Sequence, residues 1–333
     1  MSHFNVMVVT DDLPTTEVLD AALQPFHEYE CTGTLDEYVQ LVDHTEDADD
    51  NFRQNGDEGQ SFTDFIRGWY NDDWPVYTHP HPEPEPEDTP WGYSLLDSAG
   101  DHFATFRRTN PDRKWDWWVI GGRWRGQLRV VNGAQAWKGR LGVHALVSGK
   151  DTSDPRSYDQ ARVGDLDLEA MRQARIDARN KSFDEFMARK AKESDDPGLT
   201  RERMIDLADE YGTLLRQIRK EWGSYESSGL PFHEFVDQHP RGQEFRGHPA
   251  SGIDWGVGWE PEGEESIQEF LADVANPLST FAVLWDGVWY EQGSMGWWGM
   301  VSDDKKDAWT TEFTKLLAGL GEDQYITIID CHF

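Results

Sequence analysis

The hydrophobic positions near the start of the chain predict a strand followed by a short helix. Residues 4–10 form a β-prone run that stops at the turn-forming residues 11–14. Thr15 or Thr16 would serve as the N-cap of a helix that reaches Leu23, because a hydroxyl accepts a hydrogen bond from a free backbone N–H in the first turn. A second, aromatic helix is predicted over 62–70.

The pattern is clearest towards the other end of the chain. Two β-prone runs, 281–285 and 288–291, flank Asp286-Gly287, which is a strong hairpin signal. A helix over about 305–320 and a strand over 325–331 follow. Together with the first strand and helix, this order predicts an α+β fold, with a central mixed or antiparallel sheet built from both chain ends.

A tryptophan-rich stretch in the first half of the chain predicts another hairpin, over 115–131. Residues 117–120 would form one strand, Gly121-Gly122 the turn, and 123–131 the second strand. Alternation along that second strand would place its apolar and basic residues on opposite faces. Trp124, Gly126, Leu128 and Val130 would share one face, and Arg123, Arg125, Gln127 and Arg129 the other.

Two further segments interrupt this framework. Residues 166–222 repeat apolar positions every three or four residues, broken at Pro197-Gly198, so we expect a helical pair whose second member is capped by Thr200. Residues 43–90 are acidic and, from 80 to 86, rich in alternating prolines that exclude helix and interior strand. We therefore expect one α+β domain over 1–333, with a helical insertion at 166–222 and an acidic, Pro-rich loop region at 43–90.

Charge narrows the classes of partner. The formal net charge is -32, from 63 acidic and 31 basic residues, which disfavours general nucleic-acid binding and anionic membranes. Such acidity is typical of a high-GC genome or a salt-tolerant host, and an organised acidic face would instead indicate a DNA mimic. The chain has only two cysteines, Cys31 and Cys331, and no apolar run long enough to span a membrane. These features predict a cytoplasmic protein without a signal peptide.

Indoles, guanidiniums and glycines cluster in 114–126, and a second Trp-Gly cluster lies in 293–300. Indoles stack on planar rings, and Arg binds phosphate or carboxylate with two parallel hydrogen bonds. The cluster therefore predicts a pocket for a nucleotide-like ligand, although a Trp-rich core with Arg stacked upon it explains the same residues. The candidate ligand-binding residues are Asp116, Trp117, Arg123, Trp124, Arg125, Trp297 and Trp298.

Carboxylates and one histidine suggest a divalent-metal site. Asp165 and Asp167 alternate in an extended stretch, and Asp330 and His332 would share one face of the last strand. Asp165 or Asp167 would serve equally well as a helix cap before Leu168. A catalytic pair of the Cys31 thiol and the His332 imidazole, meeting across strands, is a further alternative. The common nucleotide, zinc and hydrolase signatures are absent from the sequence.

Several phrases resemble a family of uncharacterised phage and prophage proteins. They are the run from Lys114 to Trp124, Gly164-Asp165-Leu166-Asp167, the run from Gly293 to Gly299, the ending Asp330-Cys331-His332-Phe333 and the opening Ser2-His3-Phe4. The resemblance implies a phage setting and action inside a host cell, and it implies no mechanism.

The leading hypothesis is a phage-encoded accessory protein that binds a nucleotide-like or planar anionic small molecule. The phage setting adds the hypothesis that this ligand is a signal in host defence, which the protein would counter. One alternative is a metal-dependent hydrolase of such a ligand, with Asp165, Asp167, Asp330 and His332 around the metal. The other is an acidic interaction protein or DNA mimic that inhibits a host protein.

Overall fold

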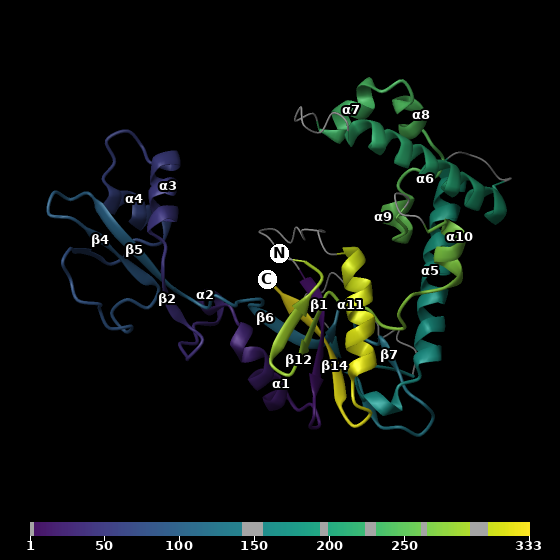
Figure 1. Ribbon diagram of the computed structural model, residues 1–333, viewed down its shortest axis with the longest axis horizontal. Helices are drawn as coiled ribbons and strands as arrows, with labels where there is room; N and C mark the ends of the chain where they lie inside the picture. The colour runs from purple at the N-terminus through teal and green to yellow at the C-terminus, as the bar shows by residue number, and fades with distance from the viewer. Residues whose placement is uncertain (1–2, 142–155, 194–198, 224–230, 261–264, 294–305) are drawn as a thin grey trace.

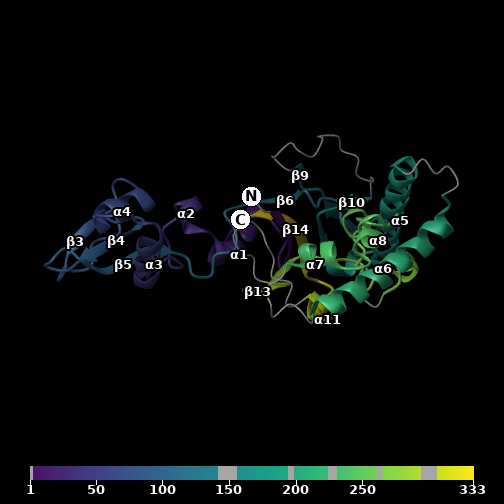
Figure 2. The ribbon, with the colours of Figure 1, turned by 90° about the horizontal axis from the view of Figure 1, so that it is seen from above.

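The structure is a computed structural model that describes residues 3–141, 156–193, 199–223, 231–260, 265–293 and 306–333. It has a central sheet, a separate lobe on one side and a set of helices on the other (Figures 1 and 2). The α+β fold expected from the sequence is confirmed. No helix within these ranges is sufficiently long and apolar to cross a bilayer.

The central sheet joins the two ends of the described chain. β1 and β14 run antiparallel, with His3 opposite His332 and Asn5 opposite Asp330. On its other side β14 pairs first with β11 and then with β6, which in turn pairs with the short β9. The strands in sheet order are β13 (Val288–Glu291), β12 (Ala282–Trp285), β1 (His3–Thr10), β14 (Tyr325–His332), β11 (Gln160–Arg162) and β8 (Ala136–Trp137), with β6 (Trp117–Gly122) and β9 (Arg140–Leu141) beside them.

Helices cover both faces of this sheet. α1 (Thr16–Leu23) begins at the N-cap Thr15, as predicted, and packs Leu19 and Leu23 against one face, followed by the 3-10 turn η1 (Gln24–Phe26). α11 (Lys306–Gly319) packs Trp309 and Phe313 against the other face. The start of α5 (Leu168–Glu193) adds Met171 to that second core.

The lobe on one side has its own sheet and core. Its strand order is β2 (Gln40–Asp43), β5 (His102–Thr109), β4 (Gly92–Leu96) and β3 (Val76–Thr78), and it carries α3 (Thr45–Asn55) and α4 (Phe62–Trp69), with α2 (Tyr29–Thr32) between it and the central sheet. Residues 43–90 are thus largely part of a folded lobe, which corrects the expectation of a loop region. The helix at 62–70 is confirmed. The Pro-rich run also has neither helix nor strand, as its prolines require.

The helical pair is confirmed and extends further than predicted. α5 is followed by α6 (Arg201–Gly223), whose Thr200 hydroxyl accepts a hydrogen bond from the Arg203 N–H at 3.2 Å. Pro197-Gly198 lies outside the described residues. Four short helices complete this part: α7 (Phe232–Gln238), α8 (Gly242–Arg246), α9 (Ile253–Val257) and α10 (Ile267–Ala272).

One of the two predicted hairpins forms. β12 and β13 are joined at Asp286 and Gly287, both with positive φ, as a tight primed turn requires. The Trp-rich hairpin over 115–131 is wrong, because β6 pairs with β14 and β9. The following strand, β7 (Leu128–Arg129), pairs with β10 (Ser157–Tyr158) instead.

Candidate functional site

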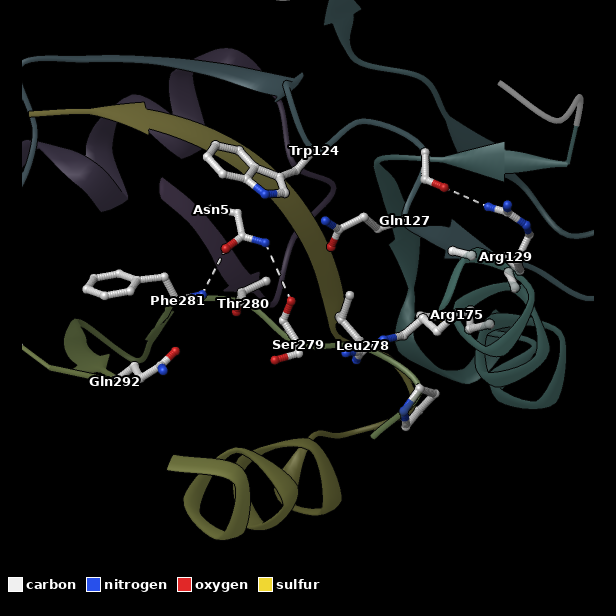
Figure 3. A pocket seen from close by; sticks show the side chains of 15 residues that line it. Asn5, Trp124, Gln127, Arg129, Arg175, Leu278, Ser279, Thr280, Phe281 and Gln292 are labelled. Atoms are coloured by element: carbon white, nitrogen blue, oxygen red, sulfur yellow. Dashed lines mark hydrogen bonds between the residues drawn. The ribbon is translucent and has the colours of Figure 1, made fainter. Parts of the chain in front are cut away.

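A cavity of about 520 Å³ lies between the central sheet and α5 (Figure 3). This volume suits a small-molecule ligand. Its walls come from β1, the loop between β6 and β7, the first half of α5, and the segment before β12. The lining residues are Asn5, Trp124, Gly126, Gln127, Arg129, Met171, Ala174, Arg175, Ala178, Pro277, Leu278, Ser279, Thr280, Phe281 and Gln292.

The loop that carries Trp124 is held by two buried carboxylates. Asp159 accepts the Gly126 N–H at 2.5 Å on one oxygen and the Gly139 N–H at 2.6 Å on the other. Asp330 accepts the Arg123 N–H at 2.9 Å. Burial raises the pKa of Asp159, and its two backbone N–H donors and the charges of Arg125 and Lys138 oppose that rise.

The glycines of this loop make room for those carboxylates. A Cβ on Gly121 would come within 2.8 Å of the Asp159 carboxyl carbon, and one on Gly122 within 2.3 Å of an Asp330 oxygen. Both glycines also have positive φ. The Gly-Gly pair therefore brings the backbone over two buried aspartates, which explains why it does not close a hairpin.

The opposite wall of the cavity is fixed by hydrogen bonds from β1 and α11. Asn5 accepts the Phe281 N–H at 2.9 Å and donates to the Ser279 carbonyl at 3.4 Å (Figure 3). The Trp309 indole of α11 donates to the Thr280 carbonyl at 2.9 Å. Residues 277–281 are therefore positioned before any ligand arrives, which lowers the entropic cost of binding.

The cavity is lined by two guanidiniums. Arg129 donates to the Gly126 carbonyl at 2.6 Å, and Arg175 donates to the Asn276 carbonyl at 2.9 Å. Burial, together with the charges of Arg179 and Arg172, lowers the pKa of Arg175 to about 10. Within the described ranges Arg175 has no carboxylate partner, so its positive charge at neutral pH is not balanced by an ion pair.

Only some of the predicted ligand residues reach this cavity. Trp124 lines it, whereas the Arg123 side chain is exposed and only its backbone contacts Asp330. Arg125 lies near Asp159, and Trp117 lies edge-on to His3 at 6.0 Å between ring centroids. Trp297 and Trp298 fall outside the described residues.

Asp116 belongs to a second polar region, where β1, β14 and β6 meet. His332 Nδ1 lies 2.7 and 2.8 Å from the two Asp116 oxygens, and His3 Nδ1 lies 2.8 Å from Asp330 Oδ1. The two imidazoles are edge to face, with centroids 5.0 Å apart. Asp330 and His332 thus share a face of the last strand, as predicted. Asp330 contacts His3, whereas His332 contacts Asp116.

The structure does not bring the four predicted metal ligands together. Asp165 accepts two hydrogen bonds from Arg162 in the 3-10 turn η2 (Val163–Asp165), beside the Tyr325 end of β14. Asp167 accepts the Ala170 N–H at 2.9 Å and caps α5, which was the alternative interpretation. Asp330 lies five residues beyond Tyr325 along β14, which places it roughly 17 Å from the Tyr325 end of the strand. Asp165 and Asp167 therefore cannot share one metal ion with Asp330 and His332.

The predicted pair of the Cys31 thiol and the His332 imidazole does not form. The Cys31 Sγ donates to Glu28 Oε2 at 3.3 Å, whereas His332 contacts Asp116. Burial, the Glu28 hydrogen bond and neighbouring carboxylates raise the pKa of Cys31 to about 12, so its nucleophilic thiolate is scarce at neutral pH.

Sequence reasoning missed several residues that build these regions. Arg175 had a signal, because it is a cation on the apolar stripe of a predicted helix. His3 had one too, because it lies in a phrase of the resemblance. Asp159 had none, since nothing local distinguishes it among 63 acidic residues.

Comparisons of the chain with protein-family models, with curated proteins and with solved structures find no match. The chemistry of the cavity must therefore be inferred from its own residues.

Proposed function

We propose that this protein binds a planar, anionic small molecule of the nucleotide-like class in the cavity between the central sheet and α5. The observation that carries the proposal is Arg175, a partly desolvated guanidinium without a carboxylate partner among the described residues, at the wall of a cavity that also contains an indole. An anionic group would supply the missing countercharge, and Trp124 would stack on the planar part of the ligand.

The rest of the lining supports this proposal. Gln127, Ser279 and Gln292 offer polar groups for orientation, and Met171, Ala174 and Leu278 supply apolar contact. Apolar surface combined with polar groups that fix orientation is typical of small-molecule sites. If the protein acts in the phage setting suggested by its motifs, binding would withdraw the ligand from a host pathway, including a defence signal.

Isothermal titration calorimetry with cyclic AMP, cyclic GMP and ADP-ribose would test the proposal. We expect saturable binding of at least one of them. Adenosine carries only the ring and ribose 5-phosphate only the anion, so each should bind more weakly than the molecule that contains both. Absence of saturable binding by all three nucleotides would overturn the proposal.

Variants connect any binding to this cavity. Arg175→Gln should weaken binding by about 10-fold to 100-fold, because a hydrogen bond to a charged group contributes about 1.5–3 kcal/mol. Trp124→Leu should weaken it by a similar factor through the loss of stacking. Arg189→Gln is the matched control on α5. Arg189 lies about 21 Å further along the helix than Arg175, and it pairs with Glu193. Equal binding by all three variants would place the ligand elsewhere.

A further inference from the structure

A thiol and two carboxylates converge near the C-terminal end of β14 and the single-turn helix α2, outside the cavity. Glu28, Cys31 and Asp116 each offer one donor atom, and these atoms all lie within 4.8 Å of one another. The Cys31 Sγ is 3.3 Å from Glu28 Oε2. Cys31 is exposed and the two carboxylates are half-buried, so the cluster is open to solvent.

Backbone contacts hold the three residues in place. The Glu28 N–H donates to the Trp115 carbonyl at 2.6 Å, and His27 and Trp115 form a parallel bridge. The Asp116 N–H donates to the His332 carbonyl at 3.0 Å, which ties it to the last strand. Glu28 is the N-cap residue of α2, whose single turn carries Cys31 back above it. The cluster is therefore a product of the fold and does not depend on mobile side chains alone.

The distance between the Cys31 sulfur and the Glu28 carboxylate is compatible with a tetrahedral metal ion. Zinc binds thiolate sulfur at about 2.3 Å and carboxylate oxygen at about 2.0–2.2 Å, which places adjacent donors roughly 3.5 Å apart. The present S···O distance of 3.3 Å, with a hydrogen between the atoms, is close to that edge. A divalent cation would take the place of this thiol hydrogen.

The surroundings of Asp116 resemble those of a metal-ligating carboxylate. His332 Nδ1 lies within hydrogen-bond distance of both Asp116 oxygens and so fixes the orientation of the carboxylate. A hydrogen-bonded partner behind a ligand is a regular feature of metal sites. Three protein donors on an exposed edge leave a coordination position for water.

We propose that Glu28, Cys31 and Asp116 form a binding site for a divalent, thiol-preferring metal ion of the zinc class, with His332 as the residue that positions Asp116. The donor set favours this class because a thiolate selects zinc over magnesium or calcium, which prefer oxygen ligands alone. None of these residues lines the cavity. The metal site and the small-molecule site therefore stand or fall separately.

Titration of the full chain with Co²⁺, followed by absorption spectroscopy, tests the proposal. We expect a near-ultraviolet thiolate-to-cobalt band that saturates at one equivalent and disappears when Zn²⁺ is added. Cys31→Ser should lose this band. Cys331→Ala should retain it, because Cys331 is fully buried in the sheet and is the only other cysteine of the chain.

Two further variants separate the ligands from the positioning residue. Asp116→Asn should weaken Co²⁺ binding by at least about 10-fold. His332→Ala should keep the thiolate band and weaken binding by about 10-fold to 100-fold, the usual effect of losing an outer partner. Thermal unfolding without metal shows that each variant is folded. The absence of a thiolate band in the folded wild type, or its persistence in Cys31→Ser, would overturn the proposal.

Discussion

Gly122 passes under the Asp330 carboxylate, whose oxygen accepts the N–H of the next residue, Arg123. Two separate constraints therefore act on this position. Its φ of +49° is a left-handed conformation, and a Cβ would meet the buried Asp330 side chain at 2.3 Å. The first constraint is shared by many glycines of the chain, whereas the second depends on one tertiary contact.

Gly122→Ala should therefore destabilise the protein more than Gly133→Ala. Gly133 has a φ of +87° and open space where a Cβ would lie, so its substitution reports the backbone strain alone, about 1–2 kcal/mol. We expect the clash at Gly122 to add about 1–3 kcal/mol to the loss in free energy of unfolding. Urea unfolding of both variants measures the difference. Equal losses in free energy of unfolding would show that the Asp330 side chain moves aside without a cost in stability.

At this scale the sequence identified the glycines but assigned them the wrong neighbour. Glycine next to large rings predicted the close approach of a ligand. The groups that approach are the carboxylates of Asp159 and Asp330, which lie 37 and 208 residues away from Gly122 along the chain. A local pattern cannot reveal contacts of such separation. The candidate site therefore keeps the predicted Trp124, and Arg129 and Arg175 line it in place of Arg123 and Arg125.

At the scale of elements, the lobe around β4 and β5 is held by a buried polar chain. The Trp74 indole donates to the Ser94 hydroxyl at 3.0 Å, and Ser94 in turn contacts the Thr105 hydroxyl at 2.8 Å. His102 links Thr105 at 2.8 Å to Asp49 of α3 at 2.5 Å. These hydrogen bonds join two strands to a helix within one lobe, and Ser94 links the Trp74 indole to the Thr105 hydroxyl.

Ser94→Ala should lower the stability of this lobe by about 1–3 kcal/mol, because it leaves the buried Trp74 N–H and the Thr105 hydroxyl without this partner. Ser98→Ala is the control, since Ser98 is exposed in the turn between the same two strands. It should change stability by less than about 0.5 kcal/mol. Hydrogen exchange of the lobe amides would measure both effects, and equal exchange in the two variants would contradict the importance of the chain.

Elements defined by short-range signals could be predicted, whereas the pairing partner of the Trp-rich strand could not. Asp286-Gly287 closes a hairpin because its turn and its strands agree locally. Gly121-Gly122 carries a similar signal, but β6 pairs with the open side of β14, where Ile120 lies opposite Ile329. Likewise, the acidic composition of 43–90 favoured a loop region, although Phe62 and Ile66 of the predicted helix form a core there with Trp74.

At the scale of the whole molecule, the acidic excess opposes folding. A net charge of -32 on a compact chain produces repulsion that the unfolded chain relieves by expanding. Ion pairs such as Arg162–Asp165 and Arg241–Glu244 offset only part of it, because they are partly exposed and acidic residues outnumber basic ones by 63 to 31.

Added salt should therefore raise the melting temperature. Raising ionic strength from 0.1 M to 1 M shortens the screening length from about 10 Å to about 3 Å, which weakens repulsion between distant carboxylates more than attraction within close pairs. We expect a rise of about 2 °C for every ~1 kcal/mol of repulsion that is screened. Thermal unfolding in NaCl and KCl measures this rise, with sucrose at equal osmolality as a control for exclusion effects.

A charge-reduced variant separates general repulsion from specific ion binding. Glu83, Glu85 and Glu87 are exposed in the Pro-rich run, so replacing all three by Gln removes charge without removing packing. This variant should melt higher than the wild type at low salt and approach it at high salt, because screening then hides the difference. If salt instead lowered the melting temperature of both proteins alike, attractive ion pairs would dominate the electrostatics. The acidic excess would then not reduce the stability of the folded state.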